Sequence, residues 1–365
     1  MKYKLRDFVE AVSETEPSPQ DSQFDRFVGL EHYDSGEIEI TRYTDTSLLS
    51  SSVKIFHAND ILIARRNVYL KRAGIVFFDG LTSGDSIILR VLKDCERNTE
   101  VPYQDALRWL PLVLNSSVFW AYANKHADGM NSKRISKEML LDYEFNAPSI
   151  TTIRSIANTV WSANSLKKNY RKLLGLTDEM VKSRFIEQFS KPEITRVPLI
   201  DLCSLFIDGD WIEAKDQSDS GYRLVQTGNV GVCEYLDKKD HSRFVSEETF
   251  KRLNCTEIHS GDILFSRLPD PIGRCCIIPK DFPKAITAVD CTITRLKDNC
   301  LPEYLMIYTT TTMYSEQIKK CVTGTTRQRI SRGNLAKITI PLPDKTKQVE
   351  FVNLVHQADK SKYLN

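Results

Sequence analysis

The hydrophobic pattern is most regular in the middle of the chain. From residue 153 to residue 173, apolar side chains recur every three or four positions, which places them along one narrow side of an α-helix. Arginine and lysine fill much of the opposite side, as in a helix that pairs with one other helix. The pattern predicts a helix that runs to about Phe189, with a bend or break at Gly175. Its apolar positions are Ile153, Ile156, Val160, Ala163, Leu166, Tyr170 and Leu173.

A shorter stretch of the same pattern lies near the C-terminus, at Phe351, Leu354, Val355 and Ala358. Like the first stretch, it follows a short apolar segment that ends in a proline, and prolines commonly stand just outside helices. The sequence therefore predicts a second helix of the same kind. Because the sequence stops at Asn365, this second helix is expected to be about half as long as the first.

Ahead of each helix, the chain repeats a short segment. In residues 55–65 and again in residues 257–267, a turn leads into Asp, Ile and Leu, and the apolar strand that they begin ends at an arginine. The residue before the Asp is Asn59 in one copy and Gly261 in the other. These two residue types tolerate best the positive φ that a tight turn often needs. The repeat therefore predicts the same turn and strand twice.

A second repeated segment contains Arg, Ile and Ser, at residues 134–136 and 329–331, and leads through an apolar strand to Pro148 or Pro343. The offset between the copies is 202 residues in the first segment and 195 in the second, so the intervening loops differ in length. A period this long indicates tandem domains rather than a solenoid. Two copies with one core and different loops predict one scaffold that presents two surfaces.

Between these landmarks the sequence is rich in short strands. Runs of β-branched and apolar residues predict strands at 223–227, 275–278 and 290–294. Longer stretches predict helices at 103–125 and 303–320, although the run of threonines in the second stretch is unfavourable for a helix. The mixture predicts an α+β fold.

Composition narrows the classes of function. Hydrophobic residues make up 41% and charged residues 27% of the chain, which is typical of globular domains and excludes disorder. The formal net charge is only +2, so a nucleic-acid surface would have to come from local basic patches. No apolar stretch is long enough to span a membrane. The charged N-terminal residues do not fit a signal peptide, which predicts a cytoplasmic protein that does not interact with membranes.

The nine cysteines do not suggest a metal site or a disulfide framework. They form no C-x-x-C pair, and their number is odd, whereas zinc sites need paired ligands at short spacing. We expect reduced thiols that act as small apolar residues. No metal site and no cofactor are predicted.

The motifs of the enzymes that modify or move along DNA are missing. The nearest approach to a methyltransferase motif is Asn146-Ala147-Pro148, which lacks the second proline and the aromatic residue, and no P-loop occurs. One alternative is a metal-dependent nuclease, in which Asp201 and Glu213 would bind the ion and Lys215 would orient water. The first copy of the repeat has no equivalent of these residues, and the simpler interpretation is a solvated turn. We therefore predict a protein that is not an enzyme.

Basic clusters on loops between the predicted strands are the candidate DNA contacts. Lys and Arg could neutralise phosphates, and Arg and Gln could read guanine and adenine edges in the major groove. The alternative is a solvated charged face, which we expect for the run Lys167, Lys168, Arg171 and Lys172 on the predicted helix. Asn229 is either a turn residue or a base contact. The candidates are Arg65, Arg66, Lys71, Arg72, Lys133, Arg134, Asn229, Arg267, Arg274, Arg327, Gln328, Arg329 and Arg332.

The order of these segments resembles the specificity (S) subunits of Type I restriction-modification systems over almost the whole chain. Each copy carries the segments of a target-recognition domain, followed by a proline and a heptad helix. The segments that carry the resemblance are 27–32, 60–62, 78–80 and 83–85 in the first copy, and 226–231, 261–264 and 271–274 in the second.

The resemblance implies two pseudo-symmetric, strand-rich target-recognition domains, at 1–148 and 191–343. It also implies antiparallel coiled-coil spacer helices at 149–190 and 344–365. In such a protein, each domain contacts one half of a split target in double-stranded DNA. The helices set the distance between the half-sites and dock two methyltransferase (modification) subunits, and restriction subunits complete the complex. The short C-terminal helix departs from this pattern. An alternative is a fragment of a fused restriction-modification enzyme.

Overall fold

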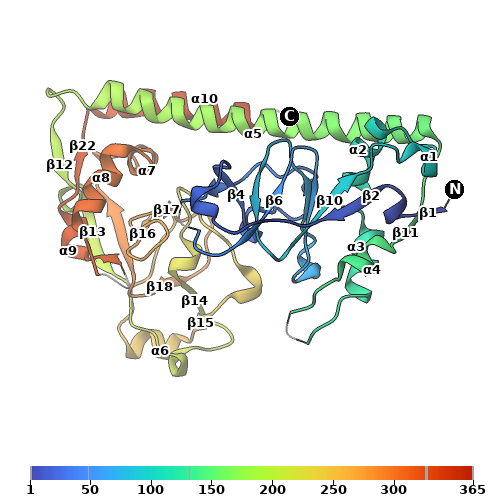
Figure 1. Ribbon diagram of the computed structural model, residues 1–365. Coiled ribbons are helices and arrows are strands. Elements are labelled where there is room, and N and C mark those ends of the chain that lie inside the picture. Colours follow the sequence, from blue (N-terminus) through green and yellow to red (C-terminus); the bar gives the residue numbers. More distant parts are fainter. Residues whose placement is uncertain (1, 48, 131, 325–327, 364–365) are drawn as a thin grey trace. The chain divides into compact units, whose positions relative to one another are not determined.

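The computed structural model describes residues 2–47, 49–130, 132–324 and 328–363, with side chains as far as residue 358 (Figure 1). The chain divides into two compact units, unit 1 at residues 1–168 and unit 2 at residues 169–365. The boundary lies within one long helix, α5 (Ile150–Phe189). None of the described helices is long and apolar enough to cross a membrane.

The centre of unit 1 is a four-stranded antiparallel sheet with the order β2-β10-β7-β8. Its strands are β2 (Val9–Val12), β10 (Ser86–Val91), β7 (Ile61–Ala64) and β8 (Ala73–Ile75). All four residues of β7 are buried, because side chains alternate between the two faces of a strand and both faces are covered. Ile61 and Ile63 join one apolar cluster, and Leu62 and Ala64 join the other.

A second sheet of unit 1 has the order β3-β6-β9-β4-β5, and β1 pairs with β11. Only β4 and β9 run parallel in this sheet. The strands are β3 (Glu14–Glu16), β6 (Val53–Phe56), β9 (Gly80–Thr82), β4 (Arg26–Val28), β5 (Thr44–Asp45), β1 (Lys2–Lys4) and β11 (Glu144–Asn146). The shorter helices of unit 1 are α1 (Glu96–Thr99), α2 (Tyr103–Val113), α3 (Ser117–Lys125) and α4 (Lys137–Leu141).

Unit 2 repeats this arrangement. A four-stranded sheet has the order β13-β19-β16-β17, a smaller sheet has the order β15-β14-β18, and two strand pairs are β12-β22 and β20-β21. The strands are β12 (Arg196–Pro198), β13 (Cys203–Asp208), β14 (Tyr222–Val225), β15 (Phe244–Val245), β16 (Ile263–Ser266), β17 (Cys275–Ile277), β18 (Ala285–Thr287), β19 (Cys291–Leu296), β20 (Val322–Thr323), β21 (Arg329–Ile330) and β22 (Thr339–Pro341). The helices are α6 (Glu247–Arg252), α7 (Pro302–Thr309), α8 (Thr312–Cys321), α9 (Arg332–Ala336) and α10 (Lys345–Tyr363).

The two units therefore share one core topology, which consists of the four-stranded sheet, three strands of the second sheet and one strand pair. The repeated strand β7 lies third in its sheet, as β16 does in the other unit, and the parallel pair β4-β9 matches β14-β18. The pair β1-β11 joins the first and last strands of unit 1, and it matches β12-β22, which joins the first and last strands of unit 2. The predicted α+β fold is confirmed. The strands predicted at 223–227, 275–278 and 290–294 correspond to β14, β17 and β19.

Each of the two long helices predicted inside the domains is in fact a pair of helices. The first breaks at Ser116, whose Oγ accepts a hydrogen bond from the N–H of Phe119 (3.2 Å), and the second breaks at Thr311, whose Oγ1 accepts from Tyr314 (3.4 Å). Both residues are N-caps, and a hydroxyl at this position satisfies one of the free N–H groups of a new helix. The prediction of single helices at 103–125 and 303–320 was wrong for this reason.

The long helix α5 continues through Gly175 without interruption, so the prediction of a break at this residue is wrong. Within the described chain, no atom lies within 4 Å of a Cβ built on Gly175, and an exposed helical glycine costs only about 1 kcal/mol. In unit 2, α10 packs against the end of α5. The ring of Phe351 lies 5.4 Å from Phe185 and 5.3 Å from Phe189, and Figure 1 shows the two helices alongside each other in opposite directions.

Candidate nucleic-acid interface

In each unit, the two segments that repeat in the sequence meet in space. The N–H of Arg65, at the end of β7, donates to the carbonyl of Asp85 (2.9 Å), and its own carbonyl accepts from Ile135 (3.0 Å). In unit 2 the N–H of Arg267 donates to Asp290 (3.0 Å), and its carbonyl accepts from Ile330 (3.1 Å). The serine after each Ile caps the next helix, α4 or α9. The same two backbone hydrogen bonds therefore position one candidate arginine in each unit, Arg65 in unit 1 and Arg267 in unit 2; we call this arrangement the repeated frame.

In unit 1, this meeting point gathers basic side chains around one carboxylate. The Asp85 carboxylate lies 3.9 Å from Arg66 Nη1 and 3.7 Å from Arg134 Nη2. Arg66 also donates from Nε to Ser132 Oγ (2.9 Å). Lys133, between Ser132 and Arg134, is exposed. We call Arg66, Lys133 and Arg134 the unit 1 basic cluster; its three positive charges exceed the single negative charge of Asp85.

In unit 2, the carboxylate at the meeting point is Asp208. It lies 3.4 Å from Arg267 Nε and 3.9 Å from Arg332 Nε, and it accepts a hydrogen bond from Thr292 Oγ1 (3.0 Å). Arg267 is buried, and its Nη2 donates to the carbonyl of Val289 (2.6 Å). The exposed side chains here are those of Gln328, Arg329 and Arg332, which we call the unit 2 polar cluster. Arg327 lies outside the described residues.

Two further candidates, Arg72 and Arg274, occupy equivalent positions after the third strand of each central sheet. Their guanidinium groups donate hydrogen bonds to backbone carbonyls of neighbouring segments. The Arg274 guanidinium donates to the carbonyls of Val230 (2.6 Å), Leu268 (2.8 Å), Thr227 (2.9 Å) and Pro271 (3.0 Å). Burial lowers the pKa of Arg274 below its usual value. Arg72 donates in the same way to the carbonyls of Leu30 (2.9 Å) and Arg66 (3.1 Å). These contacts give both arginines a structural role. Lys71, next to Arg72, is exposed.

The two remaining candidates, Asn229 and Arg65, differ in their contacts within the protein. The Asn229 side chain accepts from the N–H of Gln226 (3.0 Å) and donates to the carbonyl of Leu236 (3.0 Å), which favours its interpretation as a turn residue. Arg65 is partly buried, and among the described residues its Nε has no hydrogen-bond partner. A buried donor of this kind is costly unless it is satisfied.

Two lysines of the run on α5 are not merely a solvated face. Lys168 Nζ lies 2.8 Å from Glu39 Oε1, Lys167 pairs with Glu37, and Asn164 donates to the second oxygen of Glu39 (3.3 Å). All of these residues belong to unit 1. The contacts bind the loop that contains Glu37 and Glu39 to the helix.

The residues of the nuclease alternative do not form a metal site in the described part of the chain. Lys215 Nζ lies 2.7 Å from Glu213 Oε2, so the two exposed charges pair with each other. The backbone carbonyl of Asp201 accepts from Lys297 (2.9 Å). Among the described residues, no three acidic, His or Cys side chains are close enough to hold a metal ion. All nine cysteines are free thiols, and seven of them are buried.

The sequence analysis missed a second duplicated feature, an arginine beside two aromatic rings. The Arg26 guanidinium lies 5.1 Å from the ring centre of Tyr43 and 5.3 Å from that of Phe78. In unit 2, Arg223 lies 5.8 Å from Tyr235 and 5.9 Å from Phe282. The two arginines are at matching places on β4 and β14. The aromatic partners come from loops whose lengths differ, so no fixed spacing in the sequence reveals them.

Comparison with known proteins agrees with this geometry. Residues 193–364 match the model of the Type I restriction modification DNA specificity domain. No curated protein matches the sequence. The chain is similar to a chain in a solved structure of a type I R-M system, described for its complex assembly and conformational transition. The identity is 15%, the similarity covers 100% of this chain and 90% of that one, and the TM-score is 0.56.

It is also similar to the S subunit of a Type I restriction-modification system from M. genitalium. This identity is 12%, the coverage is 99% of this chain and 90% of that one, and the TM-score is 0.50. At such identities the structures show the fold, and the domain match covers residues 193–364. The resemblance to the specificity subunits of Type I restriction-modification systems is therefore confirmed: residues 193–364 match the model of the DNA specificity domain, and the chain as a whole has the fold of an S subunit.

Proposed function

We propose that this chain is the specificity subunit of a Type I restriction-modification system and recognises a split target in double-stranded DNA, one half with residues 1–148 and the other with residues 191–343. The observation that supports this most is the repeated frame around Arg65 and Arg267. It places a different set of side chains at the same point of the same scaffold in each unit. Equal scaffolds with unequal surfaces are what a protein needs to read two different short sequences.

The exposed members of the two clusters are the proposed DNA contacts. These are the unit 1 basic cluster with Lys71, and the unit 2 polar cluster. Arg327, outside the described residues, is proposed as a DNA contact from the sequence alone. Their charged groups can approach phosphates or base edges. Arg72, Arg267, Arg274 and Asn229 are proposed to shape the loops that carry these contacts, because their side chains already bind within the protein. Arg65 is proposed to do so through its backbone hydrogen bonds to Asp85 and Ile135.

We further propose that α5 and α10 form the spacer, at 149–190 and 344–365, and that methyltransferase and restriction subunits dock on the chain. Several large apolar side chains of α5 are exposed, among them Leu166, Leu173, Leu176 and Met180. Apolar groups in a row along a helix are typical of a surface that another protein covers. The solved structure of a type I R-M system described for its complex assembly supports this proposal.

The proposed chain does not cut or methylate DNA by itself. The alternatives are a fragment of a fused restriction-modification enzyme and a metal-dependent nuclease that uses Asp201, Glu213 and Lys215. Purified chain, incubated with DNA, S-adenosylmethionine and Mg²⁺, should produce neither methylated nor cleaved DNA. Activity of the chain alone would overturn the proposal in favour of an enzyme.

The positive test is the methylation pattern of a host that expresses the chain with methyltransferase subunits. We expect a methylated motif of two specific parts around a gap. When residues 191–343 are exchanged for the second domain of another S subunit, only one part of the motif should change. If both parts change, or if the motif is continuous, the division of recognition between the two units is wrong.

A further inference from the structure

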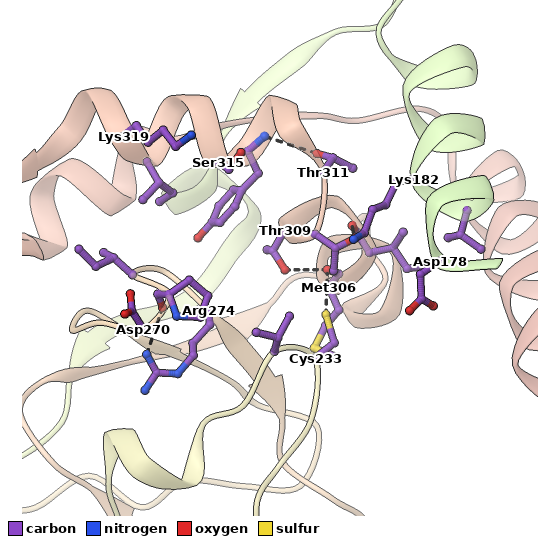
Figure 2. A pocket seen from close by; sticks show the side chains of 18 of the residues that line it. Asp178, Lys182, Cys233, Asp270, Arg274, Met306, Thr309, Thr311, Ser315 and Lys319 are labelled. Carbon is purple, nitrogen blue, oxygen red and sulfur yellow. Dashed lines mark hydrogen bonds between the residues drawn. The ribbon is translucent and has the colours of Figure 1, made fainter. Parts of the chain in front are cut away.

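Unit 2 contains a cavity of about 840 Å³ that is half open to solvent, and Gln328 of the unit 2 polar cluster is among its lining residues. It is lined by the unit 2 portion of α5, by α7, α8 and α10, and by the loop between β16 and β17 (Figure 2). Its lining is mainly apolar, with Ile272, Met306 and Ile318, and it includes the thiol of Cys233 and the small side chain of Ser315. Pockets of this size and character are typical of small-molecule sites.

The duplication indicates which side chain fills part of the corresponding space in unit 1. The N-caps of α3 and α8, Ser116 and Thr311, are 195 residues apart, the same offset as between Ile135 and Ile330. With this offset, Ser315 corresponds to Trp120. The side chain of Trp120 is only 2% exposed and belongs to the core of unit 1. Unit 2 therefore has a hydroxymethyl group at the position where unit 1 has an indole.

A second exchange enlarges the same space. The loop between the third and fourth strands of each central sheet has equal length in both units, because Ala64 pairs with Arg72 as Ser266 pairs with Arg274. By this register, Asp270 corresponds to Val68. The side chain of Val68 is 1% exposed, and the short 3-10 helix that it begins, η4 (Val68–Leu70), packs against α3. Asp270 is exposed and lines the cavity instead.

We propose that this cavity binds a small molecule with a planar, indole-sized ring system, in the place that the Trp120 side chain fills in unit 1. A largely apolar pocket of this size that is only half open can bury most of the surface of a small ligand. Cys233 and Met306 bring sulfur into the lining, and sulfur makes favourable contacts with aromatic rings. In Figure 2 both side chains lie on the side of the cavity formed by α7. The site is predicted in unit 2 alone.

Binding of indole itself to the full chain, measured by calorimetry, tests the proposal. Wild type should bind one indole per chain saturably. Ser315→Trp should fill the cavity from within and weaken binding at least tenfold, whereas the matched control Glu316→Trp, at an exposed position of the same helix outside the cavity lining, should bind as wild type does. Absence of saturable binding, or equal binding by Ser315→Trp in a folded protein, would overturn the proposal.

The thiol of Cys233 gives a second readout that needs no variant. Indole in the cavity should slow the alkylation of Cys233 by N-ethylmaleimide, followed peptide by peptide by mass spectrometry. Cys321, which is partly exposed and outside the cavity lining, is the internal control and should react at an unchanged rate. If indole leaves the rate at Cys233 unchanged, or slows both thiols equally, the ligand is not in this cavity and the proposal fails. Neither result depends on DNA binding.

Discussion

Arg90 donates two hydrogen bonds, from Nε and Nη2, to the two carboxylate oxygens of Asp60, each at 2.8 Å. Asp60 is buried and also accepts from the N–H of His57 (2.8 Å). Unit 2 contains the same arrangement, in which Arg295 binds Asp262 at 2.7 and 2.8 Å. The Asp that marks the repeat in the sequence is thus not a DNA contact in either unit. It fixes the turn before the third strand of the central sheet to the neighbouring strand.

Substitution of Arg90 by Met should destabilise unit 1 by about 3 kcal/mol, because it leaves the buried carboxylate of Asp60 without its charged partner. The measurement is urea-induced unfolding of the full chain, followed by circular dichroism. Arg97→Met is the matched control, since Arg97 is exposed and lies 3.8 Å from the exposed Asp94; surface pairs of this kind contribute less than about 1 kcal/mol. Equal losses for the two variants would contradict a structural role for the Asp60–Arg90 pair.

Replacing Gly273 by any residue with a side chain should reduce the stability of unit 2. Its φ is +78°, and an added Cβ would lie 2.8 Å from Tyr314 Oη and 2.9 Å from Ile318 Cδ1. Gly273→Ala should cost about 2–4 kcal/mol from backbone strain and overpacking together. Gly261 has φ +88°, and no described atom lies within 4 Å of its Cβ position. Gly261→Ala should therefore cost only the backbone part, about 1–2 kcal/mol. A smaller loss at Gly273 than at Gly261, measured by unfolding, would show that this packing is not tight.

Trp120 should be among the most important side chains of the unit 1 core. Trp120→Ser should destabilise the chain by about 3–5 kcal/mol, because it removes a large buried ring and leaves a cavity. Exchange at the corresponding position of unit 2, Ser315→Ala, removes only a hydroxyl group beside an existing cavity and should change stability by less than about 0.5 kcal/mol. A small effect of Trp120→Ser on the unfolding midpoint would contradict the packing described here.

The unit 1 basic cluster should contribute to DNA affinity through phosphates or bases. Replacing Lys133 by Ala should weaken binding, and if a phosphate contact is lost, the dependence of log K on log salt should become shallower by about 0.9. Replacing Arg134 should also relax the methylated motif if its guanidinium reads a base. The control is Lys125→Ala at the end of α3, which should leave the affinity and slope unchanged. Unchanged binding by both cluster variants would remove this cluster from the interface.

If α5 sets the separation of the half-sites, its length should set the gap in the motif. Insertion of seven residues near Gly175 keeps the apolar side of the helix in register and lengthens it by roughly 10 Å, or about three base pairs of DNA. Insertion of four residues breaks that register and should reduce activity more. The methylated motif of a host with the seven-residue variant provides the measurement. An unchanged gap in an active complex would show that α5 does not set the spacing.

The duplicated scaffold, several of its strands and the helix α5 could be predicted from the sequence. These features depend on the spacing of apolar residues along the chain and on turn residues such as Asn59 and Gly261, which act on their immediate neighbours. The partners of each polar side chain depend on the tertiary structure. Arg72 and Arg274 look like DNA contacts in the sequence, but carbonyls from segments up to 47 residues away bind their guanidinium groups.

Dependence on distant segments also explains why the Asp60–Arg90 ion pair and the cavity beside Ser315 could not be predicted from the sequence. Arg90 lies 30 residues from Asp60, and the first repeat carries Trp120 where the second carries Ser315. Whether an arginine faces a carboxylate, or a serine faces an empty space, depends on which distant strands and helices the folded chain brings beside it. Local periodicity carries no information about these neighbours, so the pairs and the cavity appear only when the chain is folded.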